Sequence, residues 1–182
     1  MSRLVEVYAA GDILPQYRGT PIERLLRVNN LGQNPGILAS HADLFICTCI
    51  DRRIALMLPA GSAYVVRTAG ARLDGHEFEL LFVVAIGRVS TVALIAHTDC
   101  AMGYVLEKRD EFIAGLVKHG VSPEDAAAHY DADAARYAIN DPVEAILDQA
   151  ARVRDLLPGV SVAPLLYRVE NNRLAQILEP ST

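Results

Sequence analysis

The chain has 182 residues, of which 52% are apolar and 21% charged, so it can fold around one core, and we expect a single domain over residues 1–182. The net charge of −5 and the absence of a basic stripe argue against a nucleic-acid partner. No apolar run approaches the ~18 residues of a membrane span, and no signal peptide is recognisable, so we expect no membrane association. Three cysteines do not make a secreted disulfide framework, which favours the cytoplasm.

The first 40 residues are expected to form a helical arm or cover. They contain "PIERLLRVNNLG", an amphipathic helix that the rest of the chain does not obviously need. This helix could cover a sheet formed by the main body, or it could reach across to another subunit.

The remaining chain alternates apolar runs with helical patterns. Four continuously apolar runs predict parallel strands buried on both faces, and a fifth, weaker run predicts a possible edge strand. The runs are 44–49, 63–67, 91–97, 160–167 and, for the fifth, 173–178. Helices are predicted over 76–87, 101–120, 123–138 and 142–157. Strands alternating with helices indicate an α/β fold with a mostly parallel β-sheet flanked by helices.

Three polar segments follow three of the predicted strands. They are "CIDRR" (49–53), "RTAGAR" (67–72) and "HTDCAMG" (97–103). Ligands of open parallel sheets bind outside the carboxyl ends of the strands, so we expect these segments to meet in one crevice.

Cys49, His97 and Cys100 form a candidate metal-binding set. The i, i+3 spacing of His97 and Cys100 lets both side chains face one ion, and Cys49 would join them from the neighbouring strand. Two thiolates and one imidazole are zinc ligands, and three protein ligands leave the fourth position for water. Taken singly, each cysteine could be an ordinary core residue and the histidine a hydrogen-bonded one. The joint pattern favours one Zn²⁺ per chain.

Asp51 and Arg53 are the candidate catalytic residues. Asp51 lies close enough to accept a hydrogen bond from a zinc-bound hydroxide, and Arg53 would pair with it and keep it ionised. The alternative is an ordinary exposed ion pair at a strand end. Cys47 is expected in the core, and Asp99 is expected to cap a helix beginning near Ala101.

The motifs C-x-D-x-R (49–53), R-x-A-G (67–70) and H-x-x-C (97–100) resemble those of the β-class carbonic anhydrases. The resemblance covers about residues 40–178 and is strongest to the short bacterial branch, which also contains hydrolases of COS and CS₂. It implies a zinc lyase that interconverts CO₂ and bicarbonate. It also implies that the aspartate, when unpaired from the arginine, can replace the water on the metal.

Two positions depart from the family pattern. Thr68 stands where asparagine is usual, and Ala101 stands where glycine is usual. Neither change removes a ligand, but both could reshape the loop beside the metal. The alternatives therefore stay open: a COS or CS₂ hydrolase with the same zinc site, a non-catalytic zinc-bearing binding protein or, less favoured, a thiol redox protein.

A homodimer or higher oligomer is expected for two reasons. The helix predicted over 76–87 is apolar on nearly every side, and the N-terminal helix also carries much apolar surface. A second subunit could cover both. The family resemblance implies the same, since β-class enzymes assemble from dimers with the crevice near the subunit boundary.

Overall fold

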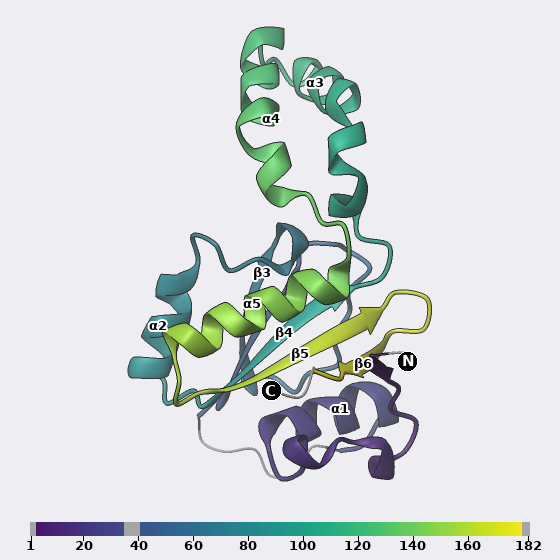
Figure 1. Cartoon of the computed structure of the whole chain (residues 1–182), viewed down its shortest axis with the longest axis vertical. Coiled ribbons are helices and arrows are strands. Elements are labelled where there is room, and N and C mark those ends of the chain that lie inside the picture. Colours follow the sequence, from purple (N-terminus) through teal and green to yellow (C-terminus); the bar gives the residue numbers. More distant parts are fainter. Residues whose placement is uncertain (1–2, 35–40, 180–182) are drawn as a thin grey trace.

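The computed structural model describes residues 3–34 and 41–179 (Figure 1). Within these residues, six strands form one sheet in the order β1-β6-β5-β4-β2-β3. Their bounds are Leu4–Val5 (β1), Leu44–Cys49 (β2), Ala63–Thr68 (β3), Thr91–His97 (β4), Ser161–Arg168 (β5) and Arg173–Ile177 (β6). The predicted α/β class with a mostly parallel sheet is confirmed, because β2, β3, β4 and β5 all run parallel.

Five α-helices accompany the sheet within the described residues. They are Pro21–Leu31 (α1), Glu77–Ala85 (α2), Arg109–Lys118 (α3), Pro123–Tyr137 (α4) and Pro142–Leu156 (α5). The same part of the chain contains four 3₁₀ segments, which are Ala10–Asp12 (η1), Pro15–Tyr17 (η2), Ala69–Ala71 (η3) and Ala101–Glu107 (η4). The start predicted for α5 is confirmed, since the Asp141 carboxylate accepts the backbone N–H groups of Val143 and Glu144 at 2.7 and 3.2 Å.

The two faces of the sheet pack against different helices because successive side chains of a strand point to opposite sides. On one face, Ile46 and Ile95 pack with Leu25 of α1 in one buried cluster. On the other face, Phe45 and Leu94 share a buried cluster with α2 and α5. Helix α1 therefore covers the sheet of its own chain, which is one of the two roles expected for the N-terminal segment. Figure 1 shows α5 lying across the sheet.

Strand β3 differs from its prediction. It lies at the end of the sheet with only β2 beside it, and most of its residues are not buried. Tyr64 and Val65 are 39% and 46% exposed. The apolar run predicts burial on both faces, but Thr68 is the one buried residue of this strand.

Strand β6 also differs, because it is not an edge strand. It is antiparallel to β5, and the two-residue strand β1 pairs with its other side. Strand β1 is too short to give a sequence pattern. Its backbone nevertheless pairs with β6 at Gln176 and Ile177, so the edge strand at this end of the sheet is only two residues long.

The helix predicted over 101–120 is broken into η4 and α3. The carbonyl of Met102 accepts the N–H of Ile139 at 3.0 Å, and the carbonyl of Val105 accepts the Tyr130 hydroxyl at 2.6 Å. The carbonyl of Val105 also accepts the N–H of Lys108 at 3.1 Å, three residues on, which is the 3₁₀ pattern. These bonds replace the regular α-helical ones, so no continuous α-helix runs through this part. Helices α3 and α4 form a pair that projects beyond the sheet (Figure 1).

None of the helices described here is both long and apolar enough to cross a membrane. The expected single domain over 1–182, with its cover over 1–40, includes residues 1–2, 35–40 and 180–182, which lie outside the described residues. That boundary stays a prediction.

Candidate metal centre

Two neighbouring strands, β2 and β4, bring the candidate metal ligands together at the carboxyl end of the sheet. Cys49 ends β2, His97 ends β4, and Cys100 follows one short turn later. The ligand atoms of these three residues all lie within 4.8 Å of one another, and all three side chains are buried. The sequence segments predicted to converge therefore do so.

His97 presents one ring nitrogen to this cluster. Its Nδ1 lies 2.9 Å from the carbonyl oxygen of Thr98, an acceptor, so Nδ1 carries the proton and donates it. Nε2 is then left with its lone pair. It is buried and has no hydrogen-bond partner among the described residues. A buried acceptor without a partner is costly, and a metal ion bonded to Nε2 would remove that cost.

The sulfurs of Cys49 and Cys100 shift each other's pKa in opposite directions. The Cys100 thiol and the His97 ring lie against the Cys49 sulfur and lower the pKa of Cys49, while the same contact with Cys49 raises the pKa of Cys100. Burial lowers the pKa of His97, but Cys49, the carbonyl of Thr98 and the carboxylate of Asp51 together outweigh burial, and the net shift is upward. The cluster thus concentrates negative charge in a buried place. Zinc fits this donor set, because the cation would displace the thiol protons and neutralise the thiolates.

Backbone N–H groups donate hydrogen bonds to the sulfurs of Cys49 and Cys100. Those of Asp51 and Gly70 lower the pKa of Cys49, and that of Met102 lowers the pKa of Cys100. Gly70 has φ +68°, and a Cβ there would lie 2.7 Å from Cδ1 of Ile139. Glycine is therefore favoured at this point of the R-x-A-G motif chiefly by its backbone conformation, since the tip of the Ile139 side chain could shift.

Asp51 and Arg53 are paired beside the cluster. Arg53 donates from Nε to Asp51 Oδ1 at 3.0 Å and from Nη2 to Asp51 Oδ2 at 2.7 Å. The backbone N–H of Arg53 also bonds to Oδ1 at 2.9 Å. These bonds to Arg53 hold the pKa of Asp51 well below its ordinary value, so the carboxylate is ionised and fixed in direction.

Arg67 binds backbone carbonyls of the loop that follows β2. It is bound neither to solvent alone nor to an open anion site, since it donates to the carbonyls of Cys49, Asp51 and Ile54 at 3.1, 2.7 and 3.3 Å. It thereby holds the loop that carries both the first thiol and the Asp51–Arg53 pair. No sequence pattern predicts these bonds.

The prediction for Asp99 is wrong. Its side chain caps no helix, and η4 begins after Cys100 without a side-chain cap. Instead the Asp99 carboxylate accepts a bond from Arg53 Nη1 at 2.6 Å. Cys47 is fully buried and absent from the metal cluster, as expected for a core residue.

Thr68, one of the two unusual positions, supports the loop after β3. Its hydroxyl donates to the carbonyl of Arg72 at 2.6 Å and lies 3.9 Å from the Cys47 sulfur. Arg72 itself pairs with Asp74. Thr68 thus stabilises the loop from Thr68 to Arg72 and is not among the candidate metal ligands.

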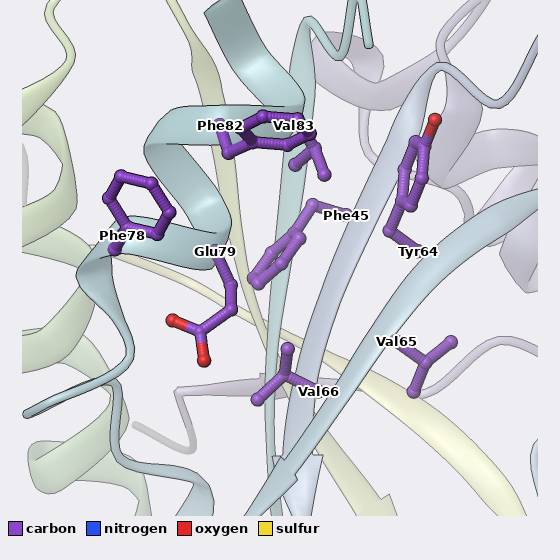
Figure 2. Close-up of a pocket in the computed structure, with 8 residues that line it drawn as sticks. All are labelled: Phe45, Tyr64, Val65, Val66, Phe78, Glu79, Phe82 and Val83. Atoms are coloured by element: carbon purple, nitrogen blue, oxygen red, sulfur yellow. The ribbon is translucent and has the colours of Figure 1, made fainter. Parts of the chain in front are cut away.

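Two apolar hollows lie near the site, and none of the three candidate ligands lines them. One apolar groove of about 410 Å³ runs between α2 and β3, where Figure 2 shows Phe78, Phe82 and Tyr64 around Phe45. A second, of about 440 Å³, lies between η4, α3 and α4 and reaches Ala69 and Met102. The buried ligand cluster, rather than a large cavity, is therefore the feature that defines this site.

Comparison with solved structures identifies the fold. A carbonic anhydrase from Glaciozyma antarctica has a TM-score of 0.61 and 25% sequence identity, covering 90% of this chain and 99% of that chain. The β-carbonic anhydrase isoform I from Trichomonas vaginalis has a TM-score of 0.65 and 20% identity, with coverage of 85% and 92%. A carbon disulfide hydrolase in its apo form has a TM-score of 0.55 and 20% identity, with coverage of 88% and 93%. No protein-family model and no curated protein sequence matches the chain.

The chain thus has the fold of the β-carbonic anhydrases, a fold that a carbon disulfide hydrolase shares. This confirms the resemblance indicated by the three sequence motifs. Together with the Cys49–His97–Cys100 group, it supports a metal-dependent carbonic anhydrase or a related hydrolase.

Proposed function

We propose that this protein is a zinc-dependent carbonic anhydrase of the β class, which interconverts CO₂ and bicarbonate. The observation that carries the proposal is the buried Cys49–His97–Cys100 group with the Nε2 atom of His97 unpartnered among the described residues. The group lies beside an ionised aspartate in a β-carbonic-anhydrase fold, which supports a catalytic metal site rather than a purely structural one.

Each residue of the centre has a proposed role. The sulfurs of Cys49 and Cys100 and the Nε2 atom of His97 would hold one zinc ion, leaving a fourth position open. When bound, zinc supplies a hydroxide nucleophile near neutral pH by lowering the pKa of a coordinated water. Thr98 keeps the His97 ring in the tautomer that offers Nε2, and Arg67 fixes the loop that carries Cys49.

Asp51 would orient the attacking nucleophile. Its carboxylate is acceptor-only when ionised, so it would take a hydrogen bond from the nucleophile and turn a lone pair toward the substrate carbon. Arg53 would keep Asp51 ionised and hold its rotamer through two parallel bonds. The same nucleophile could attack COS or CS₂, which are also linear and electrophilic at carbon, so substrate choice needs measurement.

Turnover of the three substrates by one zinc-loaded preparation tests the proposed reaction. We expect CO₂ hydration, followed by stopped-flow with a pH indicator, to exceed sulfide release from COS and CS₂ by at least about tenfold in kcat/KM. The zinc-free protein serves as the blank and should show none of the three activities. Faster sulfide release would assign the site to COS or CS₂ hydrolysis. Full zinc with no turnover of any substrate would leave a non-catalytic zinc protein.

We also propose that the chain acts as a homodimer through the face formed by α2 and β3. On this face Phe78 and Ile86 are 75% and 69% exposed, and Tyr64 and Val65 of the end strand are partly exposed as well. The face adjoins the groove of about 410 Å³. A contiguous apolar patch next to an open strand edge is typical of a subunit contact, and a second copy related by two-fold symmetry could cover both.

Phe78→Glu is expected to convert the dimer into a monomer. A charge placed at the centre of a buried apolar contact has no partner, so association should weaken by at least about tenfold. Light scattering at micromolar concentration should give twice the 19.8 kDa chain mass for the parent and 19.8 kDa for the variant. Leu106→Glu, at a 58% exposed position on η4, is the matched control and should stay dimeric. A parent protein that is fully active at 19.8 kDa would contradict the proposed dimer.

A further inference from the structure

Arg53 binds two carboxylates, and only one of them is explained by the proposed reaction. Its Nε and Nη2 atoms face Asp51, while its Nη1 donates to Asp99 Oδ2 at 2.6 Å. Nη2 also donates to the backbone carbonyl of Asp99 at 2.7 Å. All three nitrogens of the guanidinium are therefore engaged, which fixes its plane as well as its position.

Asp99 adopts a backbone conformation suited to this double contact. Its φ of 53° lies in the left-handed region, which residues other than glycine rarely adopt, although aspartate and asparagine tolerate it better than most. In this conformation both the carbonyl and the carboxylate of Asp99 bind the same guanidinium. The strained turn thus presents two acceptors to Arg53.

This contact joins the two loops that carry the candidate metal ligands. Asp51 and Arg53 follow Cys49 after β2, whereas Asp99 lies between His97 and Cys100 after β4. Among the described residues, Nη1 of Arg53 has no acceptor other than Asp99. Without the Asp99 carboxylate, Arg53 would keep only the Asp51 side of its contacts and one carbonyl. It could then pivot and carry Asp51 with it.

We propose that Asp99 is a positioning residue that locks Arg53 in the orientation that aims Asp51 at the reaction site. The effect on turnover rests on the proposed function, while the effect on Arg53 does not. An alternative role for Asp99 is to shape the turn alone. An exposed ion pair with no consequence is a second alternative, since Asp99 is 61% exposed in its side chain.

Two substitutions separate these roles. Asp99→Gly keeps the left-handed turn and removes the carboxylate, whereas Asp99→Asn keeps the turn and one oxygen acceptor but removes the charge. If Asp99 positions Arg53, kcat should fall by about tenfold in Asp99→Gly and by less in Asp99→Asn, with KM and zinc content nearly unchanged. If Asp99 only shapes the turn, the kcat of Asp99→Gly should be at least as high as that of Asp99→Asn.

The Nε–H signal of Arg53 in ¹⁵N NMR spectra of the zinc-loaded protein gives a readout independent of turnover. The signal can be assigned by its loss in Arg53→Lys. We expect its hydrogen exchange to accelerate by about tenfold in Asp99→Gly and by less in Asp99→Asn. The matched control is Asp131→Asn, which breaks the similarly exposed Arg109–Asp131 pair and should alter neither Arg53 exchange nor kcat.

Unchanged Arg53 exchange in Asp99→Gly would overturn the proposal, and so would equal kcat values for the parent and both Asp99 variants. A parent protein inactive toward CO₂, COS and CS₂ would instead contradict the proposed function. In that case the NMR comparison would still decide whether Asp99 holds Arg53.

Discussion

Replacing Cys49 with alanine is expected to abolish stoichiometric zinc binding and to lower CO₂ hydration by at least about a thousandfold. The remaining donors, Cys100 and His97, would leave two protein ligands, which is one fewer than catalytic zinc sites use. The loss also removes the sulfur toward which the N–H groups of Asp51 and Gly70 point. Elemental analysis after dialysis and stopped-flow hydration of the same sample measure both effects.

Cys47→Ala is the matched control for this substitution. Cys47 lies two residues earlier on the same strand, is equally buried, and touches Thr68 and the carbonyl of Ala71 rather than the metal cluster. This variant should lose about 1 kcal/mol of folding stability through its small cavity and keep its zinc. If Cys49→Ala retained zinc as Cys47→Ala does, Cys49 would be a core residue and not a ligand.

Replacing Arg53 with alanine is expected to lower kcat by at least about tenfold, with zinc bound and the fold intact. The substitution removes the bonds that fix Asp51 and also the link to Asp99. Freed from Arg53, Asp51 would no longer hold one direction beside the cluster. The family resemblance implies that it could then occupy the open position on the metal.

Arg109→Ala provides the comparison for Arg53→Ala. Arg109 makes an equally bidentate contact with Asp131, at 2.9 and 2.8 Å, but lies on the projecting helix pair. Its loss should change kcat by less than about twofold. A kcat for Arg53→Ala as high as that for Arg109→Ala would show that the Asp51–Arg53 pair is an ordinary surface contact.

Much of the fold could be predicted because hydrophobic patterning sets where strands begin and end. Strands β2 and β4 occupy the predicted residues 44–49 and 91–97, since both are central strands covered on two faces. Strand β3 has the same kind of sequence but lies exposed at the end of the sheet. An apolar run does not distinguish a strand that is buried within its own chain from one that lies exposed at the end of the sheet.

The candidate ligands could be predicted because their placement depends on topology alone. Parallel strands end at one edge, so residues at the ends of β2 and β4 must approach one another. Asp99 was assigned wrongly because its role depends on a left-handed φ that the sequence does not reveal. Likewise, the N–H groups of Gly70 and Met102 and the clamp made by Arg67 depend on how distant loops fold back.

X-ray absorption at the zinc edge of the purified protein tests the proposed centre most directly. We predict two sulfur atoms at about 2.3 Å, one histidine nitrogen at about 2.0 Å and one further oxygen, in a four-coordinate shell. This shell corresponds to Cys49, Cys100 and His97 with one exchangeable position. A shell of nitrogen and oxygen only, a shell of four sulfurs, or protein purified from zinc-containing medium without zinc would contradict the proposed metal centre.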